Sequence, residues 1–165
     1  MSRNPSADGR VHTGVDVVSI DRIEGLLDRF PESFVRRIFT PTEADYCHTK
    51  PFPPQHFAAR WAAKEATVKA LPRSEPPIRL RDVGIVRCGD RPELAFTGTA
   101  AAAVRRLGGT ECSVSLSHDR SAGIAMAGIV LLATNHAGGD DDADTAIVSD
   151  IGTTPESTLD TTSNP

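Results

Sequence analysis

The stretch Phe57-Ala-Ala-Arg60-Trp-Ala-Ala-Lys64-Glu65-Ala-Thr-Val-Lys69-Ala70 places four charges of mixed sign in an alanine-rich run. Alanine favours helix strongly, and Pro53-Pro54 before the run and Pro72 after it bound one helix of about 18 residues. Arg60 and Lys64 stand four residues apart, which brings two like charges together at a cost of roughly 0.2–0.5 kcal/mol unless an anion lies between them. The charges on this helix therefore indicate a site.

Two carboxylates are candidates for that site. Glu65 and Lys69 are also four residues apart, and a solvated salt bridge is the simpler explanation of that pair alone. Asp16 lies in a valine-rich run that predicts a buried strand, where a carboxylate is costly unless it is paired, hydrogen-bonded or bound to a cation. A capping or turn role for Asp16 is the alternative. One carboxylate from a strand and one from a helix, beside Lys and Arg, predict an Mg²⁺ site completed by water and substrate phosphates.

Three segments in order resemble the small 4′-phosphopantetheinyl transferases of the holo-acyl-carrier-protein synthase type. They are Gly14-Val15-Asp16, the run from Arg60 to Ala70, and Ser115-Leu116-Ser117-His118. The resemblance covers about residues 12–132. It implies the fold of that family, in which helices pack on a mainly antiparallel sheet.

The resemblance implies transfer of the 4′-phosphopantetheine arm of coenzyme A to a serine of an apo acyl carrier protein, with release of adenosine 3′,5′-bisphosphate. Asp16 and Glu65 match the Mg²⁺ ligands of the family and, with Lys69, are the expected catalytic residues. Lys69 matches a phosphate-contacting lysine, and Arg60 and His118 match residues that line the coenzyme A site. For His118, a hydrogen-bonded surface histidine at a strand end is the alternative. Glu65 or a metal-activated water is the expected base for the carrier serine.

Carrier recognition is expected to be electrostatic, because acyl carrier proteins present an acidic helix. Arg22 matches a family position implicated in docking, and Arg29, Arg36 and Arg37 extend the basic stretch, although solvated helix faces explain these arginines as well. The expected partner is a free acyl carrier protein or a carrier domain of a fatty-acid synthase, which implies a role in fatty acid biosynthesis. Small members of the family are homotrimers with active sites between subunits, so a homotrimer is expected too.

Composition favours one domain with an acidic extension. The chain has 165 residues and 39% hydrophobic content, enough for one core. All 18 basic residues but only 15 of the 22 acidic residues precede residue 121, so the −4 overall charge hides a basic body. Residues 1–10 are expected to be a flexible N-terminus, residues 11–133 the transferase domain, and residues 134–165 an acidic disordered tail.

Several protein classes are disfavoured by the same sequence. The longest apolar run, Ala122–Ala133, is too short to span a bilayer, and the first ten residues lack an apolar signal segment, so a cytoplasmic enzyme is expected. The three cysteines are widely spaced and fit reduced thiols. A small basic excess without interleaved aromatic residues argues against nucleic-acid binding.

Turn and helix signals predict the remaining elements. Thr40-Pro41-Thr42-Glu43 is a capping box with proline at the first helical position, so a helix begins there. The other expected helices are at about 21–28, 31–39, 54–71 and 98–107, and the expected strands are at about 11–20, 81–88, 93–97, 111–117 and 122–132. Early helices and late strands predict an α+β domain.

The chain departs from the family pattern in two places, and two other functions stay open. Pro72–Pro77 replaces a glycine-containing loop near the nucleotide, and the acidic tail lies outside the pattern. One alternative function is an Mg²⁺-dependent hydrolase of nucleotide pyrophosphates. The other is a non-catalytic coenzyme A-binding or assembly subunit, against which the intact Asp16, Glu65 and Lys69 argue.

Overall fold

The computed structural model describes residues 10–108, 110–133 and 147–148. Its α-helices are α1 (Ile20–Arg29), α2 (Pro31–Ile38), α3 (Pro41–His48), α4 (Pro53–Ala70) and α5 (Gly98–Arg106). Its strands are β1 (Arg10–Ser19), β2 (Val83–Cys88), β3 (Arg91–Phe96), β4 (Thr110–Asp119), β5 (Ile124–Ala133) and β6 (Ile147–Val148), and η1 (Leu80–Asp82) is a short 3₁₀ turn. The predicted α+β fold is confirmed.

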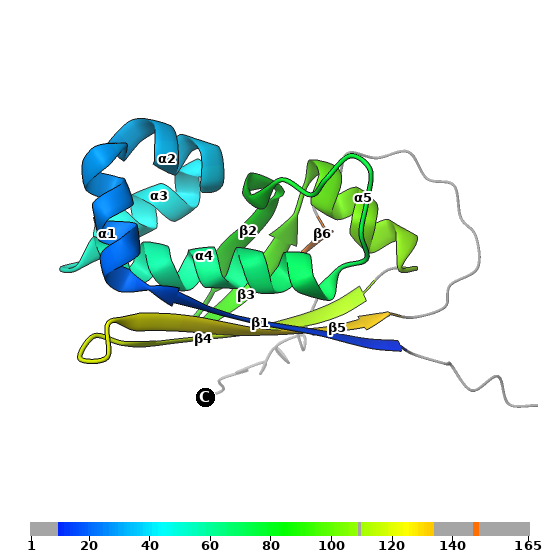
Figure 1. Ribbon diagram of the computed structural model, residues 1–165. Coiled ribbons are helices and arrows are strands. Elements are labelled where there is room, and N and C mark those ends of the chain that lie inside the picture. Colours follow the sequence, from blue (N-terminus) through cyan, green and yellow to red (C-terminus); the bar gives the residue numbers. More distant parts are fainter. Residues whose placement is uncertain (1–9, 109, 134–146, 149–165) are drawn as a thin grey trace, which may run out of the picture.

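A three-stranded antiparallel sheet, in the order β1-β5-β4, carries the longest helix, α4, along one face (Figure 1). Side chains alternate between the two faces of such a sheet. On β5, Ala127 and Ile129 are buried, whereas Met126 and Val130 on the opposite face are exposed. Among the described elements no helix covers that opposite face (Figure 1). The sheet therefore has one core face and one open face.

Gly14 sets the close spacing between β1 and α4. A Cβ atom at this position would overlap the Ala66 carbonyl oxygen and would lie 3.1 Å from the Ala70 backbone nitrogen. Both are backbone atoms of the helix, so only glycine permits this approach. Asp16 lies two residues further along the same face of β1 and is thereby held against α4.

A second sheet, in the order β2-β3-β6, packs beside the first layer. The predicted hairpin of β2 and β3 is present, with Gly89 at a φ of 57° in its turn. No ordered element is predicted within residues 134–165, yet Ile147 and Val148 pair with Phe96 and Ala95 of β3. The rest of the predicted tail and residues 1–9 lie outside the described residues.

Helices α1, α2 and α3 gather at the end where α4 begins (Figure 1). The predicted capping box is present, because Glu43 N donates to Thr40 Oγ1 at 3.2 Å and Thr40 N donates to Glu43 Oε2 at 2.8 Å. Trp61 of α4 stacks on Phe34 of α2 with 5.3 Å between ring centres, which joins these helices to the core. No helix in the described ranges is long and apolar enough to cross a membrane.

The start of β2 differs from the prediction for a physical reason. The strand expected from residue 81 begins at Val83, because Leu80–Asp82 forms η1. Asp82 Oδ2 accepts hydrogen bonds from Thr99 N at 2.8 Å and from Thr99 Oγ1 at 2.6 Å. Asp82 thus serves the first turn of α5 and holds the chain in a tight turn before β2.

Candidate active site

Asp16, Glu65 and Lys69 lie where β1 faces α4. Lys69 Nζ lies 2.7 Å from Asp16 Oδ1 and donates a second hydrogen bond of 3.2 Å to the Val15 carbonyl oxygen. The Asp16 side chain is 16% exposed and the Lys69 side chain is 55% exposed. Lys69 therefore pairs with the strand. The sequence left two alternatives open, a Glu65–Lys69 salt bridge and a turn role for Asp16. The structure shows neither of them at these residues, because Lys69 pairs with Asp16.

The Asp16 and Glu65 carboxylates fit a divalent cation. Glu65 lies one helical turn before Lys69 on the same side of α4, so the Lys69–Asp16 contact brings the two carboxylates to facing elements. Glu65 is partly exposed, and no described residue forms a hydrogen bond or ion pair with its carboxylate. Mg²⁺ is commonly held by one or two carboxylates, while water and substrate phosphates complete its shell. The described residues hold no group of three or more His, Cys, Asp or Glu side chains suited to a self-sufficient metal centre.

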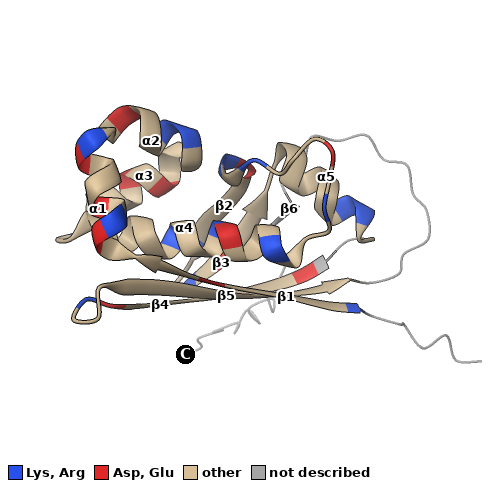
Figure 2. Ribbon diagram, viewed as in Figure 1, with Lys and Arg blue, Asp and Glu red and all other residues tan. Residues whose placement is uncertain are grey.

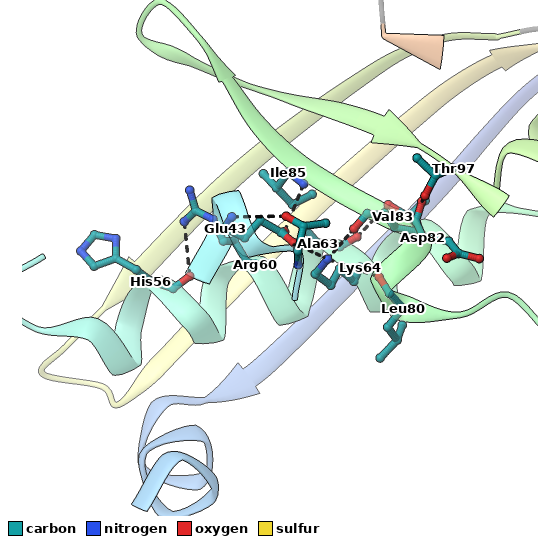
Figure 3. A network of polar contacts seen from close by, with 12 residues as sticks. Glu43, His56, Arg60, Ala63, Lys64, Leu80, Asp82, Val83, Ile85 and Thr97 are labelled. Carbon is teal, nitrogen blue, oxygen red and sulfur yellow. Dashed lines mark hydrogen bonds and ion pairs between the residues drawn. The ribbon is translucent and has the colours of Figure 1, made fainter. Parts of the chain in front are cut away.

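Lys64 lies outside this site, so the interpretation of all four helix charges as one cluster is wrong. Its amine is fully buried and donates to Glu43 Oε2 at 2.8 Å, to the Leu80 carbonyl oxygen at 3.3 Å and to the Val83 carbonyl oxygen (Figure 3). Glu43 also accepts a 3.1 Å hydrogen bond from Ile85 N. Burial lowers the pKa of Lys64, and the Glu43 carboxylate opposes that shift. The network ties α4 to α3, η1 and β2, and its role is structural.

Arg60 opens into a cavity of about 210 Å³ whose polar lining comes from α3, α4, the β2–β3 hairpin and β4. Arg60 is only 5% exposed, and its guanidinium carbon lies 4.0 Å from the centre of the Tyr46 ring. Its Nη1 donates a 3.4 Å hydrogen bond to the His56 carbonyl oxygen, whereas its Nε has no hydrogen-bond partner among the described residues (Figure 3). A buried cation with an unused donor fits an anionic ligand.

The predicted coenzyme A residues Arg60 and His118 line this same cavity. His118 is exposed near the end of β4, and its ring centre lies 5.7 Å from that of His56. Burial lowers the pKa of His56, and His118 and Arg60 lower it further. Burial raises the pKa of Tyr46, but a hydrogen bond with Arg87 and nearby positive charge outweigh it, so the pKa of Tyr46 is lowered. This positive environment favours phosphate.

The arginines expected to dock a carrier lie on α1 and α2 and are all exposed: Arg22, Arg29, Arg36 and Arg37. None of them forms a salt bridge with another described residue. Three of the four lie in the last turn of a helix, where the helix dipole favours positive charge. Solvated helix faces therefore account for their exposure, and the docking role stays a prediction.

Several residues of the site were missed from the sequence. Tyr46, His56 and Arg87 line the Arg60 cavity. His56 precedes Arg60 by four residues, so its place on the same side of α4 was a usable signal. Tyr46 and Arg87 reach the cavity from α3 and β2, and no local pattern specifies how those elements pack on α4.

Comparison with known proteins is consistent with this geometry. The holo-[acyl-carrier-protein] synthase of Gloeobacter violaceus is 39% identical over 119 residues, which cover 71% of this chain and 90% of that protein. The holo-[acyl-carrier-protein] synthase of Anaeromyxobacter sp. (strain K) is 42% identical over 124 residues, which cover 73% of this chain and 94% of that protein.

Solved structures and a family model match as well. The ACPS–CoA complex of Chronobacterium ammoniagenes has a TM-score of 0.65 and 28% identity, covering 77% of this chain and 99% of that chain. Holo-[acyl-carrier-protein] synthase from Neisseria meningitidis has a TM-score of 0.61 and 31% identity, covering 73% and 96%. The model of the 4′-phosphopantetheinyl transferase superfamily matches residues 12–125. The chain therefore belongs to the 4′-phosphopantetheinyl transferase superfamily, as its motifs predict.

Proposed function

We propose that this chain transfers the 4′-phosphopantetheine arm of coenzyme A to a serine of an apo acyl carrier protein or carrier domain, with Mg²⁺ as cofactor. One observation carries the proposal: Asp16 of β1 and Glu65 of α4 lie on facing elements beside Lys69, on the same helix that presents Arg60 to a cationic cavity. The names of the relatives and the structure with coenzyme A support the same two substrates.

In the proposed reaction, the serine oxygen bonds to the phosphorus that carries the pantetheine arm. The bond from that phosphorus to the bridging oxygen breaks, and adenosine 3′,5′-bisphosphate leaves. Mg²⁺ held by Asp16 and Glu65 would neutralise charge on the pyrophosphate. Glu65 is the proposed acceptor of the serine proton, because no described residue engages its carboxylate and it is open to solvent.

Cationic residues position coenzyme A in this proposal. Arg60 and His118 hold its phosphates, the 3′-phosphate included, in the cavity of about 210 Å³. Lys69 is 55% exposed, so its amine is free to turn from Asp16 to a phosphate oxygen of the substrate. Charge-assisted hydrogen bonds of this kind are about twice as strong as neutral ones.

We also propose that the chain acts as a homotrimer, in the cytoplasm and in fatty acid biosynthesis. The open face of the β1-β5-β4 sheet supports self-association, because large apolar patches mark interaction surfaces. Its exposed apolar residues are Val11, Val15, Val17, Ile124, Met126 and Val130. Sedimentation equilibrium tests this proposal: the wild type is expected as a trimer and Val17→Glu as a monomer, and a monomeric wild type would contradict it.

Intact-mass spectrometry of an apo acyl carrier protein tests the reaction. After incubation with the chain, coenzyme A and Mg²⁺, the carrier should gain one phosphopantetheine, and EDTA should prevent the gain. Consumption of coenzyme A without any carrier would favour the pyrophosphate hydrolase instead. Coenzyme A binding without a mass gain on any carrier would favour the non-catalytic subunit.

A further inference from the structure

A second basic surface lies between the end of α2 and η1 and is not used by the chemistry above. A cavity of about 590 Å³ between the end of α2 and η1 is lined by Arg36, Arg37, Arg79 and Arg81. All four arginines are exposed. We call this surface the arginine pocket. Arg79 and Arg81 were not among the docking residues predicted from the sequence, which are the arginines of α1 and α2.

The charge of the arginine pocket is not neutralised by the described part of the chain. The one acidic residue in its lining, Asp82, directs Oδ2 to the backbone and hydroxyl of Thr99, at 2.8 and 2.6 Å. The three ion pairs among the described residues involve Lys64, Lys69 and Arg87, and none includes an arginine of the pocket. Four positive charges therefore face solvent around one hollow.

One wall of the arginine pocket, η1, packs on α4, the helix that carries Glu65. η1 packs on α4 through the Leu80 carbonyl oxygen, which accepts a 3.3 Å hydrogen bond from the Lys64 amine. In Figure 2 the basic segments at the end of α2 and at η1 lie above α4. η1 therefore joins the arginine pocket to α4, the helix that carries Glu65.

Exposure distinguishes the arginine pocket from a site for a small anion. In the Arg60 cavity the cation is 5% exposed, which desolvates it for a phosphate. The arginines of the pocket are exposed to solvent on two separate segments of the chain. Charge spread in this way suits a broad acidic surface on a partner protein, because electrostatic attraction guides such a partner to the pocket. Arg36 and Arg37 also make the pocket continuous with α2 and its neighbour α1.

We propose that Arg79 and Arg81, with Arg36 and Arg37, form a docking contact for acidic side chains of the carrier protein, in addition to the contact expected at Arg22. The inference rests on the proposed function for the identity of the partner.

The test is the dissociation constant of a fluorescently labelled apo acyl carrier protein, measured by anisotropy, with transfer measured separately by intact mass. The variant is Arg79→Glu/Arg81→Glu. The matched control is Arg105→Glu/Arg106→Glu, which makes the same charge change at the exposed end of α5. Titrations at about 25 mM and about 250 mM salt separate screened contacts from unscreened ones. Circular dichroism checks that both variants fold.

We expect the pocket variant to weaken carrier binding roughly fivefold to thirtyfold at low salt and to lose part of the salt dependence, because exposed charge pairs contribute modestly and are screened. The Michaelis constant for coenzyme A should not change. The proposal is overturned if the pocket variant binds the carrier like the α5 control, if coenzyme A is weakened equally, or if the wild type does not bind the carrier. Arginine-dependent binding without any mass gain would uphold the docking contact and overturn the proposed function.

Discussion

Replacing Lys64 by methionine tests the buried network of Figure 3 most sharply. The side chains of Lys64 and Glu43 are both 0% exposed, and methionine fills a similar length without a donor. The variant would leave the Glu43 charge in the core and would remove the amine from the Leu80 and Val83 carbonyl oxygens. Breaking a buried ion pair costs about 3–5 kcal/mol, and a small domain has only about 5–15 kcal/mol in total. We expect a loss of about 3–5 kcal/mol in the free energy of unfolding.

Urea unfolding, followed by the fluorescence of the single tryptophan, measures this loss. One protein concentration is used throughout, because self-association stabilises a folded chain. Lys69→Met is the control, since its ion pair with Asp16 is half-exposed and such pairs contribute about 0–1 kcal/mol. Adding Glu43→Gln to Lys64→Met should recover part of the loss, because an amide replaces the unpaired charge. A loss in Lys64→Met no larger than that of the control would refute the reasoning.

Three further changes have defined outcomes. Gly14→Ala should cost about 1–3 kcal/mol of stability and slow transfer at least about tenfold, because the added Cβ pushes β1 and Asp16 away from α4. The control Gly25→Ala, whose Cβ would meet no atom within 4 Å, should keep wild-type activity, and equal transfer rates of the two variants would contradict the spacing argument. Because burial lowers the pKa of His56, the unfolded chain binds the proton of this histidine more readily than the folded chain does, so the stability of the wild type is full above about pH 6.5 and falls as the pH drops. His56→Gln should therefore lose less stability than the wild type between about pH 7 and 5, and identical pH profiles of stability would count against this. Arg22→Glu should raise the Michaelis constant for carrier far more than that for coenzyme A, and equal rises would remove Arg22 from the docking surface.

The elements of the fold were largely predictable from local signals. Alanine content and flanking prolines predict α4, the capping box predicts the start of α3, and Gly89 with Asp90 predicts the β2–β3 turn, all of which the structure contains. These features depend on neighbouring residues only. β6 was missed because two residues carry too little pattern to predict a strand.

The faces taken by the charges of α4 were not predictable to the same degree. Successive residues of a helix point about 100° apart, so adjacent Lys64 and Glu65 diverge, one toward Glu43 and the core and the other toward solvent. Spacing alone groups Arg60 with Lys64. Only the packing of α3, η1 and β2 on α4 determines that Lys64 is buried in the core with its hydrogen bonds satisfied, whereas Arg60 lines a cavity.

The central claim is that Asp16 and Glu65 together form the Mg²⁺ site of a phosphopantetheinyl transferase. The most direct measurement is the single-turnover rate of transfer to an apo acyl carrier protein across a series of Mg²⁺ concentrations. Wild type, Glu65→Gln and the control Glu111→Gln, at an exposed position of β4, are compared. We predict that Glu65→Gln is slower by roughly a hundredfold or more at every concentration, because metal stabilisation of developing charge is worth several kcal/mol, and that the control matches the wild type. A Glu65→Gln rate equal to that of the control across the series would contradict the claim.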